Sequence, residues 1–183
     1  QFIYGDCELQ EGWLEAAVSF LEKSPKHAIV CGRLRERNPE ASVYNRLCDM
    51  EWNGPVGDID SCGGIFMART EAYAEVEGMN STLAAGEEPE MCLRLRHKGW
   101  LIARINQEMA WHQAGIANFV QWWNRSVRSG KGAFTVFHVT CGQVFSLHMR
   151  RAFLWTVCWG GALICAIGIS WLFVRPSTFI VPF

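Results

Sequence analysis

Two short segments of the chain carry carboxylates in positions where ligand binding or acid–base chemistry is common. Asp6 follows the apolar run at residues 2–4, and a carboxylate just past the C-terminal end of a strand lies where α/β folds place ligand groups. Glu87 and Glu88 follow Gly86 at the start of an expected helix, whose N-terminal partial positive charge favours ionised carboxylates. An ionised carboxylate accepts a proton, so this pair suits a general base.

Each of these signals has an ordinary alternative. Acidic residues are common in the first turn of any helix, where they stabilise the helix without doing chemistry. A literal Asp-x-Asp pair, Asp58 and Asp60, competes with Asp6 as a metal-ligand candidate. This pair lies in a Gly- and Pro-rich loop with no apolar strand leading into it, so we favour Asp6.

The elements that would position these residues alternate between helices and strands. Apolar residues at helical spacing predict helices at residues 11–23, 41–52, 70–77 and 87–98. Short apolar runs predict strands at residues 1–4, 28–31, 65–68 and 100–105. Thr70 is the expected N-cap of the third helix, and glycine-containing loops fill residues 54–64 and 78–86. Such alternation predicts an α/β layered domain.

A further amphipathic helix is expected after residue 115. Its apolar positions recur at i, i+3, i+4 and i+7, and they are Ile116, Phe119, Val120 and Trp123. Arg125 and Arg128 follow, which is typical of a helix that lies on a membrane surface. The alternative is an ordinary helix that faces the protein core. Because a membrane segment follows, we favour the interfacial interpretation for residues 116–151.

The C-terminal region predicts a transmembrane helix. Residues 152–174 form 23 consecutive positions without a charge, and about 20 apolar residues span a bilayer core. Arg150, Arg151 and Arg175 flank this segment, and by the positive-inside rule residues 1–151 face the cytoplasm. The alternative is a buried core helix, which a chain of this size would enclose with difficulty. Residues 175–183 form a tail or begin a second membrane segment.

Composition excludes several classes of protein. With 50% hydrophobic and 13% aromatic residues the chain is not disordered, and its 17 Gly and 6 Pro have no collagen-like period. The net charge of −1 hides a split: residues 1–90 hold 17 acidic and 7 basic groups, whereas residues 91–183 hold 1 acidic and 10 basic groups. This asymmetry indicates surfaces that prefer ligands of opposite sign.

The eight cysteines predict a reduced protein. They are scattered without a Cys-x-x-Cys pair, and most lie in apolar runs, so we expect buried thiols in a reducing compartment. The five histidines do not pair with one another at zinc-ligand spacing.

Several segments in order resemble a family 2 glycosyltransferase of the GT-A fold. They are FIYGDCEL, GWLEAAVSFLEK, CGGIFMART, GMNSTLAAGEEPEMCLRLRHKGW, MAWHQAG and FVQWWNRSVRSG, and they cover nearly all of residues 1–132. The resemblance implies a GT-A-like, Rossmann-like mixed-sheet domain that is N-terminally incomplete, because the family's nucleotide-binding half precedes these motifs. It also fits a C-terminal transmembrane helix. We therefore expect the C-terminal part of a catalytic domain at residues 1–115.

The resemblance assigns roles to the acidic and histidine candidates. Asp6 stands at the second Asp of the family's D-x-D motif, which implies a ligand for Mg²⁺ or Mn²⁺ on a nucleotide-sugar diphosphate. Tyr4 replaces the first Asp, at a position that contacts the sugar or ribose. Glu87 and Glu88 match the family's E-D motif, in which the second acid is the catalytic base. His112 matches the His of an H-D-A segment, and we group it with the metal ligands.

Two further motifs of the resemblance concern substrates. Cys62, Gly63 and Gly64 match the loop that shapes the donor and acceptor pocket. The segment 121–125 resembles a Q-x-x-R-W motif, which implies aromatic stacking and a cation near the diphosphate, from Gln121, Trp122, Trp123 and Arg125. For Arg125 and Arg128 the alternative is attachment to anionic lipid, and the two interpretations have equal weight.

The expected function is that of a membrane-anchored inverting glycosyltransferase. It would transfer a sugar from a nucleotide-sugar donor to a glycan or lipid-linked acceptor, at the cytoplasmic side of the inner membrane, with no nucleic-acid partner. The main alternative is a non-catalytic, membrane-anchored remnant or scaffold that lacks the nucleotide-binding half. A third reading, to which we give less weight, is a small membrane-interaction protein with an unrelated α/β head.

Overall fold

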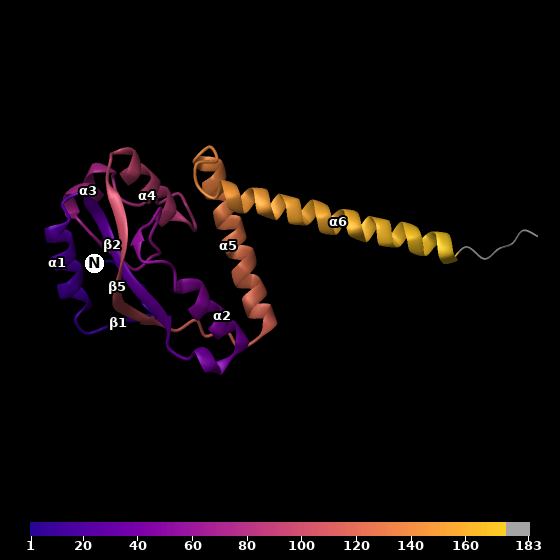
Figure 1. The fold of residues 1–183 in the computed structure, drawn as a ribbon, viewed down its shortest axis with the longest axis horizontal. Coiled ribbons are helices and arrows are strands. Elements are labelled where there is room, and N and C mark those ends of the chain that lie inside the picture. The colour runs from indigo at the N-terminus through magenta and orange to yellow at the C-terminus, as the bar shows by residue number, and fades with distance from the viewer. Residues whose placement is uncertain (175–183) are drawn as a thin grey trace, which may run out of the picture. The chain divides into compact units, whose positions relative to one another are not determined.

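The computed structural model describes residues 1–174, and residues 175–183, the expected tail or second membrane segment, lie outside the described part (Figure 1). Two compact units are present: residues 1–144 form a mixed α/β domain, and the second unit begins at Phe145. The expected α/β class is therefore confirmed as a domain with a curled five-strand mixed sheet and a long C-terminal apolar helix.

The sheet is organised around one parallel strand pair. Strand β2 (His27–Glu36) runs parallel to β5 (Leu101–His112), and β4 (Met67–Ala68) pairs antiparallel with β2. Strands β1 (Cys7–Leu9) and β3 (Gly57–Asp58) pair antiparallel with the two ends of β5. Because β1 meets the last residues of β5, the segment around Asp6 is brought to the C-terminal end of the parallel pair.

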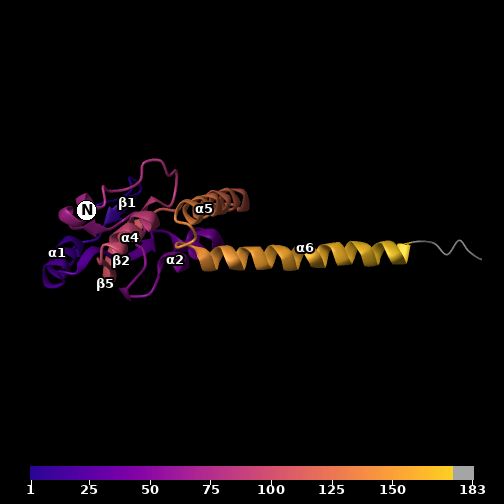
Figure 2. The same ribbon diagram turned by 90° about the horizontal axis from the view of Figure 1, so that it is seen from above.

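Helices α1 (Trp13–Lys23), α2 (Val43–Trp52) and α4 (Glu87–His97) contact β2 or β5 (Figures 1 and 2). A short 3₁₀ turn at Pro39–Ala41 precedes α2, and α3 (Thr70–Glu75) follows β4. The core is apolar and fully buried, and its largest members are Trp13, Ile29, Ile65, Phe66, Met91, Leu95 and Ile102. Burial of each such side chain stabilises the fold by about 1.5–3 kcal/mol.

The expected strand at residues 1–4 is wrong. Phe2 forms only an isolated bridge with Phe66, and the chain turns at residues 5–6, where the Cys7 N–H donates to the Tyr4 carbonyl at 3.2 Å. Strand β1 begins only after this turn. Asp6 therefore precedes a strand instead of following one, and its position depends on the pairing of β1 with β5.

Other boundaries also differ from the sequence-based expectation. The strands expected at 28–31 and 100–105 extend to His27–Glu36 and Leu101–His112, because long paired ladders tolerate the charged residues that follow each apolar run. The expected Thr70 cap is wrong, since Thr70 is the first helical residue of α3 and Arg69 precedes it without a side-chain cap. The Arg69 guanidinium instead donates to the His27 carbonyl at 2.8 Å.

Two long helices follow the sheet. Helix α5 (Phe119–Val139) begins at Asn118, whose side chain accepts a hydrogen bond from the Gln121 N–H at 3.1 Å. In helix α6 (Ser146–Val174), residues 146–171 are exposed apart from the half-buried Met149, and an 18-residue stretch within them has a mean hydropathy of 1.9. At about 1.5 Å per residue those 26 residues measure roughly 39 Å, which exceeds the roughly 30 Å of a bilayer core. This helix is long and apolar enough to span a membrane.

Candidate active site

The register of β1 on β5 brings the two expected metal ligands together. Cys7 is paired with His112 across the strands, so Asp6, one residue earlier, lies beside the end of β5. The His112 Nε2 and an Asp6 carboxylate oxygen are 3.2 Å apart, and the Gln113 N–H donates to the Asp6 carbonyl at 3.4 Å. Two residues 106 positions apart in the sequence thus form one polar pair.

Cys7 completes a three-residue cluster that sequence reasoning missed. Its thiol donates to the other Asp6 oxygen at 3.6 Å, and one ligand atom from each of Asp6, Cys7 and His112 lies within 4.8 Å of the others. Partial burial, with the negative charge of Asp6, raises the pKa of the Cys7 thiol to about 12. A carboxylate oxygen suits Mg²⁺ or Mn²⁺, whereas imidazole and thiolate favour transition metals, so this donor set fits Mn²⁺ better than Mg²⁺.

A cavity of about 470 Å³ opens beside this cluster. Its wall includes Asp6 and His112 from the sheet end, Trp52 from α2, and four polar residues of α5, which are Gln121, Asn124, Arg125 and Arg128. Those four lie at i, i+3, i+4 and i+7, so one face of α5 supplies two amides and two guanidinium groups. The Trp52 ring packs edge-on against the His112 ring, with centroids 4.5 Å apart. The cavity thus joins a possible cation site to a positively charged wall.

Arg125 is held in place by a partner on α2. Its guanidinium donates to a Glu51 carboxylate oxygen at 3.0 Å, and its side chain is about one quarter exposed. The pair ties α5 to α2 beside Trp52. It also leaves part of the Arg125 charge available to the cavity, because a guanidinium has five donors and this contact uses one.

The two expected tryptophans lie on other faces of α5. Trp122 contacts Tyr44 of α2, with ring centroids 6.1 Å apart, and Trp123 stacks on Phe119 at 6.0 Å. Trp123 is 54% exposed. The structure therefore groups Gln121 and Arg125 with the metal-ligand candidates, while Trp122 and Trp123 form an aromatic surface with their neighbours.

The second half of the candidate site is a contact between Tyr4 and the expected base. The Tyr4 hydroxyl donates to a Glu88 carboxylate oxygen at 2.7 Å, across 84 residues of sequence. Glu88 is only 7% exposed in the first turn of α4, which begins after Gly86 in a left-handed conformation with φ of 84°. Burial raises the pKa of Tyr4 well above its ordinary value, and the hydrogen bond to Glu88 raises it further. Glu87, beside Glu88, is partly exposed.

The Cys62–Gly64 loop packs against Tyr4. Cys62 is buried with its sulfur 3.6 Å from that of Cys92 on α4, which fixes the loop to the helix that carries Glu88. Gly63 and Gly64 line a smaller cavity of about 170 Å³ together with Tyr4 and Trp52. Because Trp52 also lines the larger cavity, the Tyr4 region and the Asp6 region adjoin at that ring.

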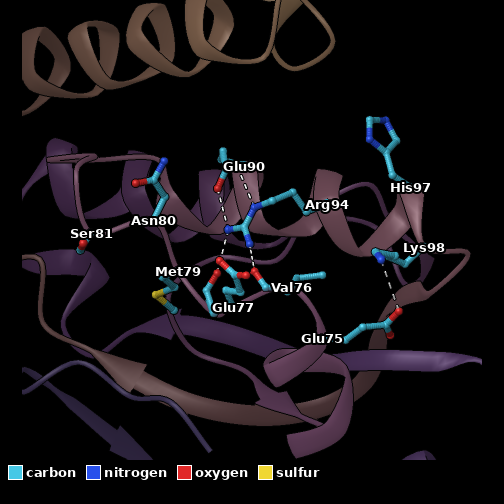
Figure 3. Close-up of a pocket in the computed structure, with 11 residues that line it drawn as sticks. Glu75, Val76, Glu77, Met79, Asn80, Ser81, Glu90, Arg94, His97 and Lys98 are labelled. Atoms are coloured by element: carbon cyan, nitrogen blue, oxygen red, sulfur yellow. Dashed lines mark hydrogen bonds and ion pairs between the residues drawn. The ribbon is translucent and has the colours of Figure 1, made fainter.

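A third cavity, of about 570 Å³, lies beside α4, and the side chains that line it hold that helix to the residues before it (Figure 3). The Arg94 guanidinium donates to both Glu90 oxygens, at 2.8 and 2.7 Å, and to the carbonyls of Val76 and Gly78. Lys98 lies 3.8 Å from Glu75. These charges are paired with one another across the cavity wall, so we assign them to holding α4 and residues 76–78 together.

A buried carboxylate positions the segment between His112 and α5. Glu36, 1% exposed, accepts from the N–H groups of Asn38 and Ala114, at 3.0 and 2.7 Å, and from the Asn45 amide at 3.3 Å. Asn45 in turn accepts from the Ile116 N–H at 3.0 Å. No sequence signal distinguishes Glu36 from the neighbouring charged residues, because its role depends on a contact with Ala114, which is 78 positions away.

The literal Asp-x-Asp pair lies at the other end of β5. Asp58 is paired with Ala103 across β3 and β5 and contacts His27 at 2.9 Å, and Asp60 forms an ion pair with Arg96 at 3.2 Å. The structure therefore separates Asp58 and Asp60 from the cluster of Asp6 and His112.

No protein-family model matches this chain, and no curated protein matches its sequence.

Proposed function

We propose that the chain is a membrane-attached inverting glycosyltransferase of the GT-A type, or the acceptor-side part of one. The observation that carries the proposal is the convergence on one cavity of Asp6, His112, Gln121 and Arg125, which come from the turn before β1, the end of β5 and α5. The sequence resemblance had assigned these same residues to metal, donor and diphosphate. A nucleotide-sugar is the donor class that matches a cation site next to guanidinium groups.

Asp6 and His112, with Cys7 beside them, would hold a divalent cation, for which Mn²⁺ fits better than Mg²⁺. The cation would offset the negative charge that develops on a nucleoside diphosphate leaving group. Arg125 and Arg128 add fixed positive charge on the α5 side of the same cavity. Lipid attachment remains the alternative role for Arg128, whereas the contact of Arg125 with Glu51 holds that side chain at the cavity wall.

Glu88 is the proposed general base. The acceptor hydroxyl oxygen forms a bond to the anomeric carbon while its proton passes to the Glu88 carboxylate. The bond from the anomeric carbon to the diphosphate oxygen breaks, and its electron pair leaves with the nucleoside diphosphate. This single displacement inverts the configuration at the anomeric carbon. Glu87 contributes negative charge near Tyr4 and Glu88.

A glycan or lipid-linked sugar is the proposed acceptor. The support is helix α6, which is long and apolar enough to span a membrane and follows the domain in the same chain. Arg150 and Arg151 lie near the N-terminal end of α6, so the positive-inside rule favours the cytoplasmic side of the inner membrane for the α/β domain.

A non-catalytic, membrane-anchored scaffold is the second candidate. Tyr4 stands where the resembling family has an acid, and its hydroxyl already occupies one oxygen of Glu88. If this contact excluded the acceptor hydroxyl, the domain would bind ligands without turning them over.

An activity screen separates the two candidates. The full chain in lipid nanodiscs is incubated with Mn²⁺ and a panel of nucleotide-sugars, and release of nucleoside diphosphate is measured. We expect turnover with at least one donor, lost in Glu88→Gln. Absence of release from every member of the panel would contradict the enzyme and favour the scaffold, which lacks the nucleotide-binding half.

A further inference from the structure

The side chains of Tyr4 and Glu88 come from segments that are far apart in the sequence, and they form a hydrogen bond. Tyr4 lies in the turn before β1 and Glu88 in the first turn of α4, and their hydrogen bond is 2.7 Å long. The donor is the phenol and the acceptor is one of the two carboxylate oxygens. The other oxygen is therefore left to accept a proton from elsewhere.

The position of the Tyr4 ring depends on Gly64. A Cβ atom added at Gly64 would overlap the Tyr4 hydroxyl and the adjacent ring carbons. A Cβ atom added at Gly63 would meet nothing within 4 Å. Neither glycine has a positive φ, so the backbone conformation does not require glycine at these positions. Glycine matters at position 64 because the absence of a side chain leaves room for the Tyr4 ring.

We propose that Tyr4 is a positioning residue that orients the Glu88 carboxylate by hydrogen bonding, and that Gly64 provides the space in which it does so. This inference rests on the proposed function, in which Glu88 is the base. It replaces the role in substrate contact that the sequence resemblance implied for Tyr4.

The chemistry of the contact favours orientation over substrate binding. A hydroxyl that donates to a carboxylate favours the ionised, proton-accepting form. Glu88 is almost fully buried, so hydrogen-bond donors of the protein must replace the water that its carboxylate oxygens would otherwise contact. The titratable groups that face the pair are Glu87 on α4 and the thiols of Cys62 and Cys92. The Cys62 and Cys92 sulfurs contact each other at 3.6 Å, and the hydroxyl of Tyr4 donates to Glu88.

Three variants test the assignment in steady-state kinetics. Tyr4→Phe keeps the ring and removes the donor, and Gly64→Ala keeps the tyrosine and displaces its ring. We expect both to lower kcat about 10- to 100-fold, the effect of losing one hydrogen bond to a charged group, with an unchanged KM for the donor sugar. Gly130→Ala is the control, because a Cβ atom added at Gly130 also meets nothing within 4 Å and Gly130 lies outside the proposed site, so this variant should keep the wild-type kcat.

A direct substrate contact would give the opposite pattern. If Tyr4→Phe and Gly64→Ala raise KM and keep kcat, Tyr4 binds substrate and the inference is overturned. Equal kcat losses in Gly130→Ala and Gly64→Ala would overturn the role of Gly64.

A second measurement needs no activity, so the inference can fail or hold independently of the proposed function. A double-mutant cycle compares the wild type, Tyr4→Phe, Glu88→Gln and the double variant by the free energy of unfolding of the domain. Because a 2.7 Å hydrogen bond joins the two side chains and Glu88 is buried, the double variant should lose less stability than the sum of the two single variants. Losses that simply add would overturn the contact itself.

Discussion

Two histidine–aspartate pairs lie at opposite ends of the β2–β5 strand pair, and their internal geometry is nearly the same. His112 and Asp6 are 3.2 Å apart at one end, and His27 and Asp58 are 2.9 Å apart at the other. Both histidines are mostly buried, with side-chain exposures of 19% and 15%, and both aspartates are mostly exposed. In each histidine, Nδ1 is buried without a hydrogen-bond partner among the described residues.

The surroundings of the two pairs differ. Around His112 and Asp6 lie a third possible ligand, Cys7, and a cavity with two arginines. His27 instead packs against the Phe20 ring at 5.1 Å, and its carbonyl accepts from Arg69. The residues 101 and 112 that mark the two ends are separated by a strand contour of roughly 36 Å, at about 3.3 Å per residue.

A histidine–aspartate pair alone therefore does not make a candidate site. The His112 end is one because further ligand groups and a cavity lie beside the pair. Ligand sites in α/β sheets form outside the carboxyl ends of parallel strands, because the connections that leave those ends can meet there. His112 ends β5 at that edge, and the following segment leads directly into α5 with its arginines. His27 begins β2 at the opposite edge, where its neighbours are packing residues.

The largest expected effect is on sugar transfer. Asp6→Ala should lower kcat/KM by at least about 100-fold, because it removes a proposed ligand of the cation that faces the diphosphate. Asp58→Ala removes a carboxylate that contacts a histidine in nearly the same geometry, and its kcat/KM should stay within about twofold of the wild-type value. Release of nucleoside diphosphate at several Mn²⁺ concentrations measures both. If Asp58→Ala abolishes metal dependence and Asp6→Ala does not, the roles of the two ends are reversed.

Much of the fold could be predicted from periodicity and composition. Helix α4 begins at Glu87 as predicted, and the uncharged run at 152–174 lies within α6. The strands were harder to predict, because β2 continues through Arg33 and Arg35, and β5 continues through the polar residues 106–108, which end the apolar pattern. Burial of one face and pairing on both edges maintain a strand that hydropathy alone would end.

The candidate site was less accessible to prediction, because its contacts depend on register and on distant segments. Asp6 was chosen for a strand that ends before it, whereas the structure has a turn there and a strand after it. Its contact with His112 follows from the pairing of Cys7 with His112, which a single sequence does not reveal. Trp52, which lines two cavities, had no distinguishing signal, because its role depends on how α2 packs beside β5.

A second, intermediate effect concerns the reactivity of Cys7. Burial and the charge of Asp6 raise the pKa of this thiol to about 12, so at pH 8.5, without a cation, only a small fraction is thiolate. Asp6→Asn removes the charge and should lower that pKa. Alkylation of Cys7 by iodoacetamide should then be faster, since each pKa unit changes the thiolate fraction about tenfold.

Residue-resolved mass spectrometry measures this rate. Asp58→Asn is the matched control and should leave Cys7 unchanged, and the exposed Cys141 provides an internal reference in every variant. Equal Cys7 rates in the wild type and in Asp6→Asn would contradict the contact between Asp6 and Cys7.

The smallest expected effect is on stability, and there the two ends should behave alike until metal is added. Without a cation, each histidine–aspartate pair has an exposed carboxylate in high dielectric, so Asp6→Asn and Asp58→Asn should each change the free energy of unfolding by only about 0.2–1 kcal/mol.

A ligand that binds only the folded state stabilises it by an amount that depends on the ratio of its concentration to Kd. Saturating Mn²⁺ should therefore raise the melting temperature of the wild type and of Asp58→Asn, but not that of Asp6→Asn. The rise in melting temperature with Mn²⁺ should likewise be kept in His27→Gln and lost in His112→Gln. Thermal melts require neither donor nor acceptor, so this test does not depend on sugar transfer. If Mn²⁺ shifts the melting temperatures of Asp6→Asn and Asp58→Asn equally, the proposed cation site at the His112 end is contradicted.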